Sequence, residues 1–198
     1  ARGQLATTAT VREFEAVRVF SPTAEHREVF AEEFAGRIDA DVSAVGSTSA
    51  ALAGADVVIT ATTASDPVID DAAIEPGTHV TAMGQYHPEK NELPPELVAR
   101  ATYVPDLRAR ATRDAGSFLA AVDAGLIDAE TGVAADLGAV VAGEHPGRTS
   151  DDEVTVFDSG GTGIETAAAA HMLYKRASEA GRGQSIEFAP ASEALTGR

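Results

Sequence analysis

Hydrophobic residues along the chain fall into short apolar runs that alternate with amphipathic stretches. The apolar runs predict strands, which we place at Ala16–Phe20, Asp41–Val45, Asp56–Thr63, Thr78–Met83, Thr102–Val104 and Val154–Phe157. The amphipathic stretches predict helices at Ala1–Glu13, Ala24–Ala35, Ser47–Ala53, Glu96–Ala101 and Ile164–Ala180, with several short helices across Leu107–Gly143. Apolar strands separated by short helices are typical of a parallel, doubly wound sheet. The sequence therefore predicts an α/β fold.

One helix and the end of the chain carry further local signals. Thr23 is a good N-cap for the helix at Ala24–Ala35, and Val29, Phe30 and Phe34 are expected to form its inward stripe. The residues from Arg182 to Arg198 are expected to be loosely structured.

The strand at Thr78–Met83 leads into a Gly turn and a polar loop with site-like chemistry. Gly84 ends the strand, and Gln85, Tyr86, His87 and Lys90 follow. In open α/β sheets, ligands bind outside the carboxyl ends of the strands. An amide, a phenol and a lysine at such an end predict a ligand site. The alternative is a polar connection to the next helix that binds nothing.

Composition limits the partners. The 198 residues include 31 acidic and 15 basic side chains, for a formal charge of −16, and Lys90 and Lys175 are the only lysines. This acidic excess argues against nucleic acid and anionic membranes as partners. It favours an enzyme adapted to high salt. The chain has no cysteine and no apolar run of about 18 residues, so we expect a soluble, cytoplasmic protein.

Several catalytic and metal-binding patterns are missing from the sequence. The histidines do not have metal-ligand spacing, so no metal site is expected. A dinucleotide fold carries its Gly-rich loop after the first strand, and we expect that strand and loop to lie upstream of Ala1. Ser159–Gly163 (Ser-Gly-Gly-Thr-Gly) is a possible substitute, but its spacing differs from G-x-G-x-x-G and favours a tight turn.

The end of the first predicted strand lacks the acidic residue that accepts ribose hydroxyls in many NAD-binding sheets. Ser21 and Thr23 stand there instead, and Arg27 follows one helical turn later. Hydroxyls and an Arg can bind a 2′-phosphate, which favours NADP as well as NAD. The alternative is an ordinary N-cap beside a solvated Arg.

Four segments, taken together, resemble the ornithine cyclodeaminase/mu-crystallin family. They are Ala1–Leu5, Val57–Thr63, Ala82–Gly84 with Pro88–Leu93, and Gly147–Ser159. The resemblance implies a Rossmann domain that binds NAD or NADP and follows an N-terminal domain for substrate binding and homodimerisation. It also implies an amino-acid or imine substrate and hydride transfer at its amine or imine carbon.

The resemblance also implies roles for individual residues. Ser21 corresponds to a contact with the adenosine ribose, and the remaining cofactor contacts correspond to Thr62, Met83, Gly84, Gln85, Lys90 and Ser159. The residues 1–153 would form the truncated cofactor domain. Residues 154–198 would form a last strand, a long helix and a tail that pack toward the N-terminal domain.

Tyr86 stands where cyclodeaminases of this family carry their catalytic aspartate. A phenol is a weak general base at neutral pH, so this departure favours an alanine dehydrogenase or ketimine reductase over a true cyclodeaminase. The cyclodeaminase, a non-catalytic mu-crystallin-like binding protein, and a different Rossmann enzyme such as a glutamyl-tRNA reductase stay as alternatives.

Overall fold

The computed structural model describes residues 1–186, in two compact units that divide after Gly160. The strands are β1 (Ala16–Val19), β2 (Asp41–Ala44), β3 (Val57–Thr60), β4 (His79–Ala82), β5 (Thr102–Pro105) and β6 (Thr155–Asp158). The helices are α1 (Arg2–Thr8), α2 (Ala24–Phe34), α3 (Thr48–Leu52), the 3-10 helix η1 (Asp71–Ala73), α4 (Pro95–Arg100), α5 (Arg108–Asp114), α6 (Gly116–Asp123), α7 (Leu137–Val141) and α8 (Gly163–Glu179).

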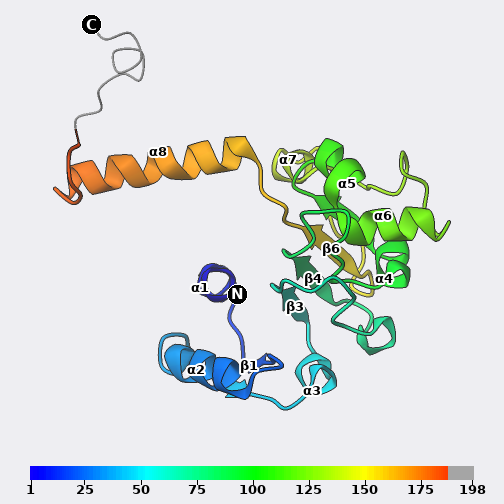
Figure 1. Ribbon diagram of the computed structural model, residues 1–198, viewed down its shortest axis with the longest axis horizontal. Helices are drawn as coiled ribbons and strands as arrows, with labels where there is room; N and C mark the ends of the chain where they lie inside the picture. The colour runs from blue at the N-terminus through cyan, green and yellow to red at the C-terminus, as the bar shows by residue number, and fades with distance from the viewer. Residues whose placement is uncertain (187–198) are drawn as a thin grey trace, which may run out of the picture. The chain divides into compact units, whose positions relative to one another are not determined.

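The described strands pair only in parallel, which confirms the predicted α/β fold. A four-stranded sheet has the order β3-β4-β6-β5, and β1 and β2 form a separate two-stranded sheet (Figure 1). Strand β6 therefore lies between β4 and β5, although it comes last in sequence. As a consequence, the residues that follow β4 and β6 are direct neighbours.

The break between the two sheets has a defined place in the topology. In doubly wound dinucleotide folds with strand order 3-2-1-4-5-6, the first strand lies between the second and the fourth. Strands β1 and β3 match the second and fourth strands of that order. The break thus falls between the strands that match the second and fourth of that order.

The core of the first unit is built on the alternation of side chains along the sheet. In β3, β4 and β6 every second residue is buried, as the two-residue period of a strand requires. Val58, Val80 and Val156 occupy the buried positions in the middle of these strands. The same alternation buries Thr60 and Asp158, which are polar residues at the carboxyl ends. Polar groups are thus buried at the carboxyl ends of the strands, which we call the carboxyl edge of the sheet.

A smaller core lies against β1 and β2, where Leu5, Phe30 and Phe34 are buried. The rings of Phe30 and Phe34 stack with their centroids 4.8 Å apart. The sequence analysis also placed Val29 in this stripe, but its side chain is 46% exposed. A helix turns by about 100° per residue, so Val29 lies beside the stripe that Phe30 and its (i, i+4) neighbour form.

Two helix ends differ from the sequence prediction. Helix α1 ends at Thr8, whereas the pattern predicted a helix to Glu13. Thr23 is the N-cap residue of α2 as predicted, but its side chain makes no capping hydrogen bond.

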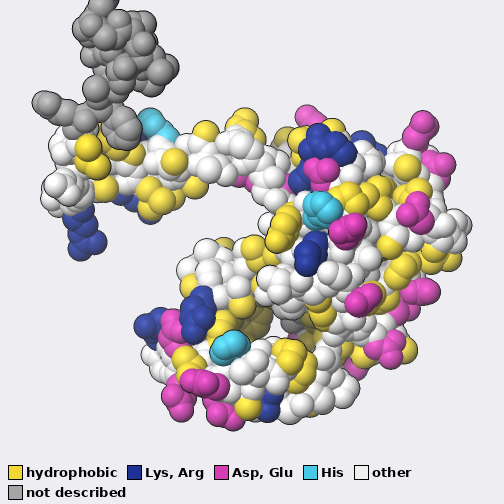
Figure 2. All heavy atoms as spheres, viewed as in Figure 1, with side chains coloured by type: hydrophobic (Ala, Val, Ile, Leu, Met, Phe, Trp, Pro, Cys, Tyr) yellow, Lys and Arg dark blue, Asp and Glu magenta, His cyan; other side chains and the backbone are white. Residues whose placement is uncertain are grey.

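The second unit is described through α8. Thr162 and Glu165 form a capping box at the start of this helix. Residues 159–162 carry no helix, strand or turn, so the tight turn that the spacing favoured is not formed there. No residue of α8 is buried within the described chain, and large apolar side chains lie along it (Figure 2), with Ile164, Leu173 and Tyr174 the most exposed. Residues 182–186 form neither helix nor strand, and the rest of the predicted tail lies outside the described residues.

Candidate functional site

Backbone hydrogen bonds continue past the ends of the four-stranded sheet and align the residues that follow each strand. Met83 N–H donates to the Thr60 carbonyl (3.1 Å), and Ser159 N–H donates to the Ala82 carbonyl (2.9 Å). Because these bonds join neighbouring strand ends, Met83 and Ser159 lie in one row at the carboxyl edge. This edge is where parallel α/β sheets bind ligands.

Most of the predicted cofactor residues gather at this edge. They are Thr62 after β3, Met83, Gly84 and Gln85 after β4, Lys90 in the following loop, and Ser159 after β6. The Lys90 ammonium group donates to the Thr63 carbonyl (2.8 Å) and to the Ser65 hydroxyl (3.3 Å). Lys90 therefore fastens its loop to the segment after β3.

The β4–α4 loop is also held from the side of α6. Leu93 N–H donates to the Ser117 hydroxyl (3.1 Å). A Cβ atom at Gly116 would meet the carbonyl oxygens of His87 and Lys90, so the loop backbone lies directly against the first turn of α6. Only glycine permits this approach.

Glu92 is a site residue to which the sequence analysis gave no role. Its side chain is fully buried, and its two carboxylate oxygens accept four hydrogen bonds from the ends of β3 and β4. Oε1 accepts from Thr62 N–H (2.5 Å), and Oε2 accepts from the Thr60 hydroxyl (2.9 Å). Oε2 also accepts from the N–H groups of Met83 (3.0 Å) and Gly84 (2.6 Å). Glu92 thus joins two adjacent strand ends through one carboxylate.

Gly84 is confined between these groups. A Cβ atom at this position would meet the Thr62 carbonyl oxygen and the Glu92 carboxylate. The absence of a side chain therefore lets the end of β4 approach both partners.

A second buried cluster lies below the ends of β5 and β6. The Arg110 guanidinium pairs with Asp106 through Nε (2.7 Å) and with Asp158 through Nη2 (2.9 Å). The Tyr103 hydroxyl donates a hydrogen bond to Asp158. A Cβ atom at Gly160 would collide with the guanidinium, so the backbone after Ser159 lies flat on Arg110.

Burial is the main cause of the pKa shifts of Asp158 and Tyr103 in this cluster. It raises the pKa of Asp158, against the opposing influence of the Arg110 guanidinium and the hydrogen bond from Tyr103. Burial also raises the pKa of Tyr103 well above its ordinary value, with a further contribution from the charge of Asp158. The Tyr103 phenol therefore stays protonated and acts as a donor.

The Gln85 side chain points into this interior. It is fully buried, and its amide lowers the pKa of Asp158. Neither polar atom of the amide has a hydrogen-bond partner in proper geometry within residues 1–186. Burying an amide without hydrogen-bond partners costs free energy. The Gln85 amide is therefore a candidate to bind a polar group of a ligand.

Tyr86 lies on the outside of the loop. Its side chain is 56% exposed. The next residue, His87, accepts a hydrogen bond from Glu89 N–H at Nδ1 (3.3 Å), which makes a local turn. The phenol is thus accessible beside the carboxyl edge rather than held in the interior.

Ser21, Thr23 and Arg27 form a second group, at the end of β1 in the two-stranded sheet. Arg27 Nη1 donates to the Ser21 carbonyl (2.9 Å) and closes the turn into α2. The hydroxyls of Ser21 and Thr23 make no hydrogen bond within residues 1–186. These hydroxyls are available to a ligand at the carboxyl end of β1.

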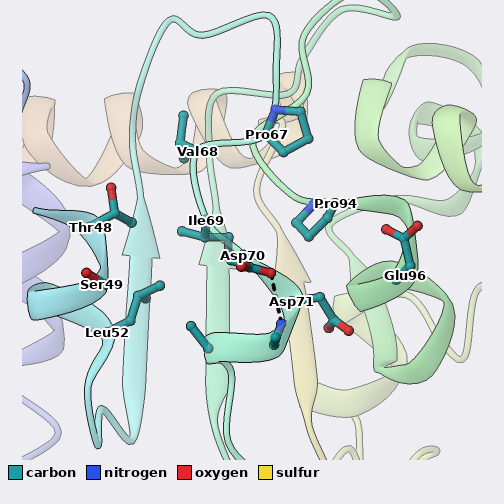
Figure 3. Close-up of a pocket in the computed structure, with 12 residues that line it drawn as sticks. Thr48, Ser49, Leu52, Pro67, Val68, Ile69, Asp70, Asp71, Pro94 and Glu96 are labelled. Carbon is teal, nitrogen blue, oxygen red and sulfur yellow. Dashed lines mark hydrogen bonds between the residues drawn. The ribbon is translucent and has the colours of Figure 1, made fainter.

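An open hollow lies elsewhere, between α3, η1 and the start of α4 (Figure 3). Its volume is about 680 Å³, and the predicted site residues do not line it. Two of its three acidic groups already serve the fold, since Asp70 accepts a hydrogen bond from Ala72 N–H (3.1 Å) and Asp71 pairs with Arg100 (2.7 Å). Acidic lining also disfavours phosphate groups. We therefore place the candidate site at the carboxyl edge.

Within residues 1–186, no group of three or more His, Asp or Glu side chains is arranged to hold a metal ion. No helix in this part of the chain has the length and apolar character needed to cross a membrane.

Comparisons with known proteins find relatives that match nearly the whole of this chain. The ornithine cyclodeaminase/mu-crystallin family model matches residues 1–181. A Δ1-pyrroline-2-carboxylate reductase of Bacillus cereus strain ZK / E33L is 32% identical over 189 residues, which is 95% of this chain and 58% of the relative.

Two solved structures are similar to the present one. The first is the Δ1-pyrroline-2-carboxylate reductase of Thermococcus litoralis in complex with NADH and L-proline (TM-score 0.89, 31% identity, 93% of this chain and 57% of that chain). The second is an archaeal alanine dehydrogenase dimer with bound NAD (TM-score 0.85, 31% identity, 94% and 57%). The chain thus spans little more than half the length of these proteins.

Proposed function

The chain belongs to the ornithine cyclodeaminase/mu-crystallin family, and we propose that it is the NAD(P)-binding part of an enzyme that acts on amino acids. The full-length enzyme would transfer hydride between nicotinamide and an amine or imine carbon. The observation that carries the proposal is the convergence of Thr62, Met83 and Ser159 on one carboxyl edge. Solved relatives that contain NADH or NAD support the cofactor.

The residues present fit such a cofactor at both ends. The free hydroxyls of Ser21 and Thr23, with the nearby Arg27, suit the ribose and a 2′-phosphate. The row that contains Met83 and Ser159 offers a polar and apolar surface for the nicotinamide end. The nicotinamide supplies the redox chemistry, whereas the protein orients the reacting groups and excludes water.

Tyr86 favours a reductase or dehydrogenase over a cyclodeaminase. A cyclodeaminase needs a carboxylate to move protons while an amine or water adds to the imine. The accessible phenol of Tyr86 can donate a hydrogen bond to an imine substrate or a bound water, which suits a step that polarises the acceptor carbon. We therefore favour the alanine dehydrogenase or ketimine reductase type.

Further properties of the full-length protein follow from the same proposal. We propose a cytoplasmic homodimer that works at high salt, and the solved alanine dehydrogenase dimer supports the oligomeric state. The exposed apolar side chains of α8, Ile164, Leu173 and Tyr174, would be covered by another domain of the protein.

The test is an assay of the full-length protein at high salt with three substrate sets. We expect NADPH-dependent reduction of a cyclic imine carboxylate, or of a keto acid with ammonia, and little conversion of ornithine to proline with catalytic NAD⁺. Efficient proline formation that persists in Tyr86→Phe would support the cyclodeaminase instead. Cofactor binding without turnover of any set would support the non-catalytic binding protein.

A further inference from the structure

The backbone at the nicotinamide end of the proposed site is held from inside the protein. Strands β3 and β4 stop pairing at Thr60 and Ala82, so the N–H groups of Thr62 and Gly84 have no strand partner. Glu92 supplies that partner for both (2.5 and 2.6 Å). Its full burial leaves no room for water to replace the carboxylate.

On the basis of the proposed function, we propose that Glu92 is the positioning residue for the nicotinamide end of the cofactor. It acts through the backbone of Thr62, Met83 and Gly84 and does not touch the cofactor itself. The residues it holds are the ones that resemblance assigns to the cofactor, and sites of this kind require their groups within about 0.5 Å of the productive geometry.

The chemistry of the four donors explains why a carboxylate is needed. Three backbone N–H groups and the Thr60 hydroxyl all point at the same side chain. A glutamine would present an NH₂ group, which cannot accept a hydrogen bond, to at least one of these donors. That strand end would then shift or leave a buried donor without a partner.

The adenosine half of the proposed site provides an internal reference. Ser21 and Thr23 follow β1 of the separate two-stranded sheet, and Arg27 lies on α2. Within residues 1–186, Glu92 makes no hydrogen bond to them. The affinity for a ligand that lacks nicotinamide should therefore not change when Glu92 is replaced. The affinity for a ligand that carries nicotinamide should fall.

The experiment measures, by calorimetry on the full-length protein, the affinity for NADPH and for 2′-phospho-ADP-ribose, the same molecule without nicotinamide. Glu92→Gln should weaken NADPH binding about 10- to 100-fold, which corresponds to about 1.4–2.8 kcal/mol and lies within the cost of a buried donor left without a partner. It should change 2′-phospho-ADP-ribose binding by less than about twofold. Glu89→Gln is the matched control, because Glu89 is an exposed acid of the same loop. It should change neither affinity.

The proposal would be overturned if Glu92→Gln weakened the binding of both ligands equally, or weakened the binding of neither. If Glu92→Gln does not fold, Thr60→Val removes the hydroxyl donor while Thr60→Ser keeps it. A selective loss of NADPH affinity in Thr60→Val alone would support the role of Glu92, and no selective loss would refute it. If the wild-type protein binds neither ligand, the proposed function is contradicted. If the wild-type protein binds both ligands but the variant shows no selective loss of NADPH affinity, only this inference is contradicted.

Discussion

Removing the Arg110 guanidinium should cause a large and pH-dependent loss of stability. The side chains of Arg110, Asp106 and Asp158 are 9%, 1% and 0% exposed, and the two ion pairs are 2.7 and 2.9 Å long. Arg110→Met keeps most of the packing volume but leaves two buried carboxyl groups without their cation. Breaking a buried ion pair in this way costs about 3–5 kcal/mol.

This cost is large compared with the typical free energy of unfolding of a domain, about 5–15 kcal/mol. For a chain of this size it corresponds to a fall in Tm of about 6–20 °C. Urea unfolding followed by circular dichroism measures the free energy directly. Arg113→Met is the control, because Arg113 lies one turn away on α5, is exposed, and forms an ion pair with its neighbour Asp114 on the surface. It should leave the free energy of unfolding nearly unchanged.

The pH dependence tests the electrostatic cause. The pKa of Asp158 is already raised by burial, and Arg110 opposes that rise. Loss of Arg110 should therefore raise this pKa further. A carboxyl group with a raised folded-state pKa gives stability that is present below its unfolded value and lost as the pH rises through the folded value. The penalty of Arg110→Met should thus be smaller at pH 4 than at pH 7. A penalty below about 1 kcal/mol at pH 7, or one equal at both pH values, would refute this reasoning.

Three further predictions concern single residues. Gly84→Ala should destabilise the protein by about 1–3 kcal/mol in urea unfolding, because its Cβ meets backbone and carboxylate oxygens, whereas Gly138→Ala, with open space in α7, should be neutral or slightly stabilising. Hydrogen bonds from the Thr102 hydroxyl and Thr149 N–H lower the pKa of Glu153 to about 2. Its contribution to stability is therefore present above pH 4.5 and lost as the pH falls toward 2, and Glu153→Gln should flatten the free energy of unfolding over that range. Ser21→Asp should lower kcat/KM for NADPH relative to NADH through repulsion of the 2′-phosphate, and an unchanged ratio would contradict the assignment of Ser21 to the adenosine ribose.

The local pattern of the sequence was sufficient for the elements and for one edge of the sheet. Short apolar runs predicted the six strands to within a few residues, because alternation along a strand is a local property. The location of the loop after Thr78–Met83 followed from the rule that parallel sheets bind ligands at the carboxyl ends of their strands, whereas Ser159 was assigned to the cofactor by resemblance alone. The structure brings Met83 and Ser159 together.

The buried charges could not be predicted, because their partners are far away in sequence. Glu92 binds donors 30 and 32 residues upstream, and the hydroxyl of Tyr103 meets Asp158 across 55 residues. A lone acid in a polar loop looks solvated until these partners are known. The position of β6 between β4 and β5 also depends on contacts between residues far apart in the sequence. The sequence therefore could not show that Met83 and Ser159 are neighbours.

Hydride transfer from nicotinamide to an imine carbon, as proposed for the full-length protein, can be followed with an isotope label. The full-length protein is incubated at high salt with a cyclic imine carboxylate and NADPH that carries deuterium on one face of C4. We expect mass spectrometry to find one deuterium on the α-carbon of the amino-acid product with one labelled face and none with the other. Product that carries no deuterium with either labelled face, or no product at all, would contradict it.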